Sequence, residues 1–178
     1  MKFGDHHIKT CIKNFEELKV LGEKAFSQIK DKDFFWSFEE ESNCLAIIIK
    51  HLSGNMISRW TDFLITDGEK DFRNRDSEFE ISIPRNKKDI IDKWEKGWKC
   101  LFETINMLTG DDLLKEITIR NQKHTVVQAI NRQLIHYGYH IGQIVYLAKL
   151  LAKTNWNTLS VARGRSKEFN ERMSKKNK

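Results

Sequence analysis

Proline, glycine and cysteine are scarce in this chain of 178 residues. One proline and nine glycines leave few sharp turns, which argues against a β-sandwich or β-barrel and favours long helices. The three cysteines are widely spaced and form no Cys-x-x-Cys pair. We therefore predict reduced thiols that pack as small apolar residues, rather than a disulfide framework.

Long apolar runs are also missing. The longest, residues 45–49 and 144–152, fall far short of the ~20 residues that cross a membrane. The first residues lack the apolar stretch of a secretory signal. Together with the reduced cysteines, these absences predict a cytoplasmic protein that does not enter a membrane.

Most of the positive charge lies at the C-terminal end. Residues 163–178 contain seven Lys or Arg and two Glu, which accounts for +5 of the net charge of +6. The remaining residues are nearly neutral, so a basic nucleic-acid groove on the folded body is not expected. We predict a helical domain over residues 1–162 and a frayed, solubilising basic tail over residues 163–178. Nucleic-acid binding through that tail is the weakest of three functional hypotheses.

Apolar residues at three- and four-residue steps predict four long helices, approximately over residues 5–29, 43–66, 87–108 and 126–154. Thr125 is placed to cap the last of them. Residues 67–86 are charged and aperiodic, and too long for a simple bundle connection. Short extended pieces are expected at residues 78–83 and 117–119. The fold class is all-α: an up-down four-helix bundle with a long crossover between the second and third helices.

Two histidines stand one turn apart in the last helix. His136 and His140 lie on the same face, at a spacing that allows both imidazoles to bind one ion. His51 borders the apolar face of the second helix and could complete a three-nitrogen site with an open position. An isolated pair of this spacing is common, and a buried mid-helix histidine is often only hydrogen-bonded, so the residues alone leave a structural role open. His6, His7 and His124 are expected at the surface.

Polar residues near these histidines are candidates for orienting ligands or substrate. Asn55 and Gln133 lie one turn from His51 and His136, although they could equally satisfy backbone groups. Arg59 and Arg132 could recognise a carboxylate, although a solvated helix face is the simpler interpretation. Gly138 and Gly142 flank His140 and predict close approach by a neighbouring helix.

Three segments together resemble the DinB/YfiT superfamily of metal-dependent bundle proteins, and more narrowly a bacterial branch of it with no assigned function. They are residues 51–63 (HLSGNMISRWTDF) with 67–70 (DGEK) and 73–76 (RNRD), residues 136–146 (HYGYHIGQIVY), and residues 156–160 (WNTLS) with 163–166 (RGRS) and 169–170 (FN). The resemblance implies a DinB-like dimeric bundle that holds a divalent metal through His51, His136 and His140. Superfamily members with an assigned activity are transferases or isomerases that use a low-molecular-weight thiol.

Three neutral imidazoles suit zinc best, with nickel, iron or manganese as alternatives. The first hypothesis is therefore a metal-dependent transferase that joins a low-molecular-weight thiol to an electrophilic small molecule. No thiol-binding motif and no carboxylate placed as a general base is evident in the sequence. The second hypothesis is a homodimeric bundle whose metal has no catalytic role.

Overall fold

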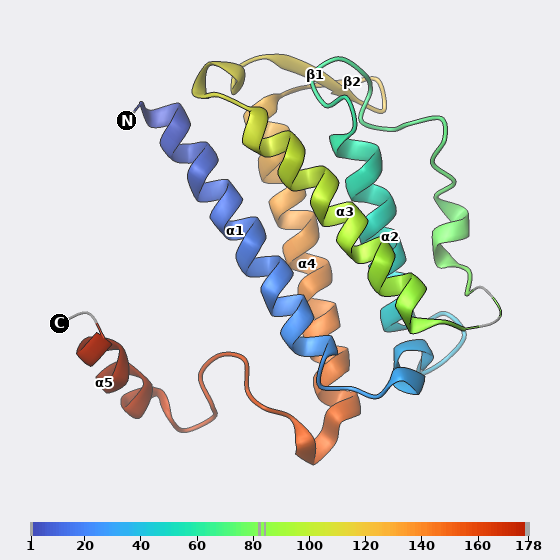
Figure 1. Cartoon of the computed structure of the whole chain (residues 1–178), viewed down its shortest axis with the longest axis vertical. Coiled ribbons are helices and arrows are strands. Elements are labelled where there is room, and N and C mark those ends of the chain that lie inside the picture. Colours follow the sequence, from blue (N-terminus) through green and yellow to red (C-terminus); the bar gives the residue numbers. More distant parts are fainter. Residues whose placement is uncertain (1, 82, 84, 177–178) are drawn as a thin grey trace.

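The computed structural model describes residues 2–81, 83 and 85–176, and within them the chain is mostly helical (Figure 1). Four long helices dominate: α1 (Phe3–Phe26), α2 (Leu45–Trp60), α3 (Lys87–Met107) and α4 (Val126–Ala152). The shorter elements are η1 (Asp31–Phe35), η2 (Asp76–Phe79), η3 (Gly110–Asp112), β1 (Glu116–Ile119), β2 (Gln122–Thr125), η4 (Lys153–Asn155) and α5 (Ser166–Lys176). The predicted helical class is confirmed, with one small antiparallel hairpin added.

The long helices pack along their lengths. α2 packs mainly against α3, and α1 mainly against α4, while α2 also contacts α4. α1 and α4 run in one direction and α2 and α3 in the other (Figure 1). Because α2 and α3 run the same way, the chain between them must return along the length of α2. The contact between α2 and α4 is the one that brings residue 51 toward residues 136 and 140.

Aromatic side chains fill the centre between these helices. Phe15, Trp60, Trp98 and Tyr137 are fully buried, and the Phe15 and Trp60 rings meet edge to face with centroids 5.9 Å apart. Burial of each such ring stabilises the fold by about 1.5–3 kcal/mol. The Trp60 indole N–H donates to the Tyr137 hydroxyl at 3.1 Å, and that hydroxyl donates to Oδ1 of Asn55 at 3.1 Å. This relay fixes the side chain of Asn55 from inside the core.

The helix ends differ in part from the sequence prediction. α2 stops at Trp60 rather than near residue 66, because Thr61 is extended and Asp62 takes a left-handed φ of 48°. Its N-cap is Cys44, with no capping side chain. Thr125 caps α4 as predicted and forms a capping box with Gln128. The predicted extended piece at residues 117–119 is confirmed as part of β1.

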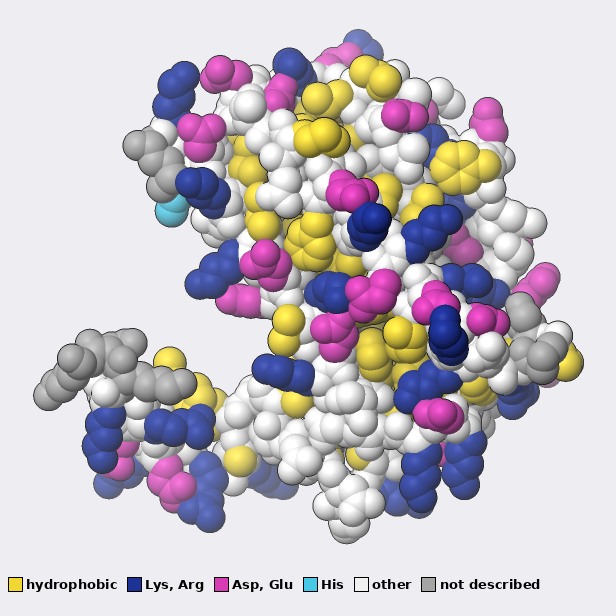
Figure 2. All heavy atoms as spheres, in the orientation of Figure 1, with side chains coloured by type: hydrophobic (Ala, Val, Ile, Leu, Met, Phe, Trp, Pro, Cys, Tyr) yellow, Lys and Arg dark blue, Asp and Glu magenta, His cyan; other side chains and the backbone are white. Residues whose placement is uncertain are grey.

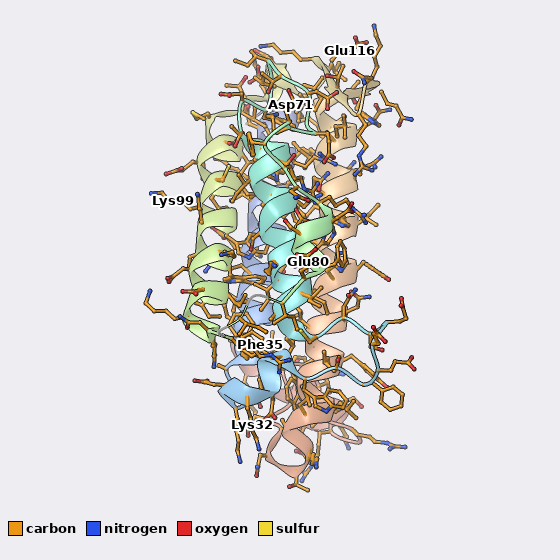
Figure 3. The ribbon with its side chains drawn as sticks, turned by 90° about the vertical axis from the view of Figure 1, so that its right-hand side faces the viewer. Lys32, Phe35, Asp71, Glu80, Lys99 and Glu116 are labelled. Carbon is orange, nitrogen blue, oxygen red and sulfur yellow. The ribbon has the colours of Figure 1, made fainter. Side chains whose placement is uncertain are left out.

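The connection between α2 and α3 contains a turn that the sequence did not predict. The alternation at residues 78–83 predicts an extended piece, but Asp76–Phe79 forms a 3₁₀ turn. Ser82 and Pro84 lie outside the described residues. The Lys50 ammonium donates to the Ser77 carbonyl oxygen at 2.8 Å and holds this turn against α2. Figure 3 faces the connection, from Asp71 near one end of α2 to Glu80 beside its middle.

The sequence predicts a frayed C-terminal tail, but most of this segment is helical. Ser166–Lys176 forms α5, which lies away from the four long helices (Figure 1). Lys and Arg side chains gather over it in Figure 2, whereas acidic and basic side chains alternate over much of the rest of that face. Residues 177–178 of the predicted tail lie outside the described residues. The division of the chain at residue 162 stays a prediction.

Two further expectations concern small residues. The predicted close approach at Gly138 and Gly142 is wrong within this chain, because a Cβ at either position would meet nothing within 4 Å. The cysteines are free, as predicted; Cys11 and Cys44 are buried and Cys100 is half-buried. Burial raises the pKa of Cys11 and Cys100, so both remain unreactive thiols at neutral pH.

No helix within the described part of the chain combines the length and the apolar character needed to cross a bilayer. The predicted cytoplasmic location stays a prediction.

Asp67 joins the connection to the hairpin. Its Oδ1 accepts from the backbone N–H groups of Glu69 and Arg120 at 2.7 and 2.8 Å, and its Oδ2 accepts from Asn121 N–H at 2.8 Å. Arg120 and Asn121 form the hairpin turn with φ of 54° and 60°. Burial alone would raise the pKa of Asp67, but these three N–H groups outweigh it and lower the pKa to about 2.

We expect Asp67→Asn to lower the free energy of unfolding by about 1–3 kcal/mol at pH 7, because an amide replaces a charged acceptor of three N–H groups. The unfolded pKa of aspartate is about 3.9, so the folded protein binds fewer protons. This stabilisation is therefore complete above about pH 5 and is lost as the pH falls toward 2. Urea unfolding curves of both proteins should converge over that range.

Asp71→Asn is the matched control, since Asp71 is exposed on the same connection. It should change stability by no more than about 0.5 kcal/mol. A stability gap between wild type and Asp67→Asn that is the same at pH 7 and at pH 2 would contradict this role for Asp67.

Candidate metal centre

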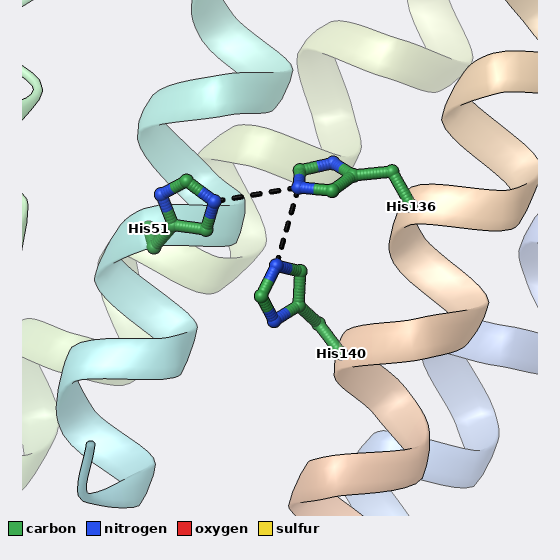
Figure 4. A group of neighbouring side chains, drawn as sticks. All are labelled: His51, His136 and His140. Atoms are coloured by element: carbon green, nitrogen blue, oxygen red, sulfur yellow. Dashed lines mark hydrogen bonds between the residues drawn. The ribbon is translucent and has the colours of Figure 1, made fainter. Parts of the chain in front are cut away.

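Three imidazoles from two helices meet at one point. His51 comes from α2, and His136 and His140 come from adjacent turns of α4 (Figure 4). Nε2 of His136 lies 3.4 Å from Nε2 of His51 and 3.2 Å from Nε2 of His140. One nitrogen of each ring lies within 4.8 Å of the other two, so this group could hold a metal ion. The structure therefore brings together the three histidines that the sequence singled out.

These nitrogen–nitrogen distances fit three ligands of one shared metal ion. Two imidazole nitrogens bound to zinc at about 2.0–2.1 Å with tetrahedral angles lie about 3.3 Å apart. The contacts of 3.2 and 3.4 Å bracket that value.

Hydrogen bonds on the far side of two rings decide which nitrogens are free. Nδ1 of His51 lies 2.9 Å from Oε2 of Glu78, and a carboxylate only accepts, so Nδ1 must donate. Nδ1 of His140 likewise lies 2.7 Å from Oε1 of Gln143. In the neutral form of each ring the lone pair then lies on Nε2, which faces Nε2 of His136, and that nitrogen can donate at most one proton. A cation at this point would remove the remaining repulsion between lone pairs.

The protonation of the rings also favours a cation. Burial, the neighbouring imidazoles of His140 and His51, and the positive charges of Arg59 and Arg73 lower the pKa of His136 to about 3. Burial also lowers the pKa of His140. Both rings are therefore neutral at pH 7, which is the form that binds metal.

Glu78 is the carboxylate that the sequence analysis did not find. It is 6% exposed and lies in the space left by Gly54 of α2, where a Cβ would overlap its Oε1. Arg73 holds it with two hydrogen bonds, of 2.8 and 2.9 Å. Burial alone would raise the pKa of Glu78, but His51 and Arg73 outweigh it and hold the pKa below its ordinary value. Glu78 is thus an ionised partner that orients His51.

A second carboxylate, Glu69, joins three arginines from different elements. Arg59 of α2 donates to Oε2 of Glu69 at 2.9 Å, and Arg120 of the hairpin donates to the same atom at 3.0 Å. Arg73 lies 3.5 Å from its Oε1. The 61–86 connection, the hairpin and α2 are therefore tied together beside the histidines.

A cavity of about 190 Å³ opens next to the cluster. His51 and His136 line one side of it, so an ion held by the three histidines would have an open position facing the cavity. The four polar residues that the sequence proposed for orienting ligands or substrate all line it: Asn55, Arg59, Arg132 and Gln133. Three arginines that the sequence analysis did not assign line it as well: Arg73, Arg75 and Arg120.

The donor set narrows the chemistry of the site. Within the described residues, no Cys, Asp or Glu joins the three histidines as a ligand. The other histidines, at positions 6, 7 and 124, also lie outside the group. Three imidazoles with one open position match the ligand type of a catalytic zinc site rather than a closed structural one. The identity of the metal is open among the divalent transition metals.

A helical protein with three converging imidazoles beside a polar cavity belongs to the class of candidate metal-binding helical proteins. Residues 2–165 match the family described as "Protein of unknown function (DUF1572)". Because the match covers most of the chain, the protein belongs to this family. A search of curated proteins finds no significant match.

We expect Glu78→Gln to weaken zinc binding by about 10- to 100-fold, since the residue that fixes a ligating histidine is replaced by a neutral amide. The affinity is measured by competition with a chromogenic chelator. Glu80→Gln is the matched control, because Glu80 is exposed on the same connection. Equal zinc affinity in the Glu78 and Glu80 variants would rule out the orienting role of Glu78.

Proposed function

We propose that this protein is a divalent-metal-dependent enzyme of the DinB-like type, with a four-helix bundle as its scaffold. It transfers a low-molecular-weight thiol to an electrophilic small molecule. The observation that carries this proposal is the convergence of three imidazole Nε2 atoms beside a cavity that His51 and His136 line. Zinc is the metal we propose first, because three imidazoles suit it.

A divalent ion bound there supplies Lewis acidity, which favours the deprotonated, nucleophilic form of a thiol at neutral pH. In the transfer, the thiol proton passes to solvent and the sulfur lone pair forms the new bond to carbon. The leaving group of the electrophile departs with the electrons of the bond that breaks. Hydrolysis is the less favoured use of the same site.

The residues of the chain bind and orient the reactants. Glu78 and Gln143 hold two of the rings, so that their Nε2 atoms face the ion. The Trp60 indole only donates, so the Tyr137 hydroxyl accepts from it and donates to Oδ1 of Asn55. The NH₂ group of Asn55 is thereby left to donate into the cavity, where it can hold a substrate oxygen.

His136→Ala should lower zinc affinity by more than about 100-fold, since loss of a ligand exceeds the usual effect of changing its hydrogen-bond partner. Elemental analysis of untagged protein measures bound metal, and His6→Ala, an exposed histidine, is the matched control. The metal-loaded protein is then screened with common thiols and an electrophile for conjugate formation.

Unchanged metal content in the His136 variant would refute the metal site. Metal binding without conjugation for any thiol tested would instead favour the second candidate, a non-catalytic metal-binding bundle that assembles as a dimer.

An exposed apolar stripe on α4 supports a homodimer under either function. Its large residues are all at least 52% exposed and recur at helical spacing: Ile135, Tyr139, Tyr146 and Leu150. Gly138 and Gly142 lie among them with open space where a Cβ would stand. A second copy of α4 packed across a twofold axis would cover the stripe, with the glycines allowing close approach.

We expect Tyr146→Glu to weaken the dimer by about 100-fold or more, because a twofold axis places the new charge in the interface twice. Light scattering coupled to size exclusion measures the mass over a concentration series. Asn106→Glu, an exposed position on α3, is the control. A wild-type protein that is monomeric at about 100 μM would contradict this assembly.

A further inference from the structure

The cavity beside the histidines is lined by polar and charged side chains alone. Such a wall offers little apolar contact to a ligand, so an apolar group would lose hydration there with little gain in packing. Five of the lining residues are arginines, contributed by α2, the long connection, the hairpin turn and α4: Arg59, Arg73, Arg75, Arg120 and Arg132.

The acidic side chains around these arginines neutralise only part of their positive charge. Glu69 is shared by Arg59, Arg73 and Arg120, and Glu78 pairs with Arg73. In the described part of the chain, neither Arg75 nor Arg132 forms an ion pair with an acidic side chain. The five guanidinium groups thus exceed their carboxylate partners by three positive charges. Positive charge gathered around a small cavity repels itself unless an anion is bound there.

The five arginines form a buried inner pair and an exposed outer group of three. The side chains of Arg59 and Arg73 are 4% and 3% exposed, and hydrogen bonds to Glu69 and Glu78 fix them in place. Arg75, Arg120 and Arg132 are exposed at the opening. Arg75 also lies 5.1 Å over the ring of Phe79, which limits where its guanidinium can reach.

Two buried polar atoms in this wall have no hydrogen-bond partner among the described residues. They are Nε of Arg59 and Oε1 of Gln133, in side chains that are 4% and 2% exposed. A buried polar group without a partner destabilises the fold, and a ligand can supply the missing hydrogen bond. The amide of Gln133 can turn so that its NH₂ group donates into the cavity. Both residues line the same small cavity.

We propose that this cavity binds an oxyanion, a carboxylate or phosphate group of the substrate, beside the three histidines. Arg75 and Arg132 provide uncompensated charge, while Arg59 and Gln133 provide buried donors. A planar guanidinium matches the paired oxygens of either group. The inference rests on the proposed function in so far as it names the chemistry of the substrate, but anion binding at the arginines needs no metal.

The test is titration of the full-length chain with inorganic phosphate and, separately, with malonate, by calorimetry at constant ionic strength. Both titrations are run with and without zinc. At least one anion should bind the metal-free protein with a Kd below about 1 mM. The double variant Arg75→Gln/Arg132→Gln should weaken that binding by about tenfold or more. Tighter binding of phosphate or of malonate identifies which of the two groups the cavity prefers.

Arg163→Gln/Arg172→Gln is the matched control, since it removes the same charge from the C-terminal segment. An equal loss of affinity in both double variants would show non-specific attraction and overturn the proposal. So would the absence of binding by either anion at about 10 mM.

Chelator competition on the same proteins separates this inference from the proposed function. Zinc affinity should be unchanged by the cavity variants. Binding of phosphate without binding of zinc would refute the proposed metal enzyme and leave the anion site standing. Binding of zinc without binding of either anion would refute the anion site and leave the metal enzyme standing.

Discussion

The contact between Glu78 and His51 is the constraint on which the rest of the site depends. It fixes which nitrogen of His51 faces α4, and it also anchors the long connection against the helix that carries His51. An ionised carboxylate at this depth is stable because Arg73 donates to both of its oxygens and Nδ1 of His51 donates to one of them. Arg73 in turn meets Glu69, so the alignment of one ring is coupled to charges on the connection, on α2 and in the hairpin.

The same network explains how so many arginines remain close together. Glu69 and Glu78 pair with Arg59, Arg73 and Arg120, and this leaves Arg75 and Arg132 available to a ligand. The histidines and the arginines therefore offer different chemistry on adjoining walls: neutral nitrogen donors for a cation, and N–H donors with positive charge for an anion. Under the proposed function, a substrate that carries a negative group near its reacting atom would meet both walls at once.

The helices, the three histidines and four polar residues of the cavity could be predicted from the sequence, but Glu78 and Arg73 could not. His136 and His140 follow from spacing within one helix, and Thr125 follows from its place before an apolar repeat. Glu78 and Arg73 lie in an aperiodic segment, where only tertiary contacts decide which charges become buried. The alternation at residues 78–83 suggested an extended piece, but pairing of Glu78 with Arg73 and docking of Lys50 on Ser77 favour a compact turn that takes in residues 78 and 79. Gly138 and Gly142 were misjudged because nothing in one copy of the chain packs there.

Gly54 has no side chain and touches no ligand, yet α2 leaves room for Glu78 only because this position is bare. A single methyl group there would push the carboxylate away from His51 while all three imidazoles stayed in the sequence. Substitution of Gly54 could therefore disturb the candidate metal centre without altering any of the three histidines. Natural variants that carry a bulkier residue at this point would keep the three histidines but lose the contact that aligns His51.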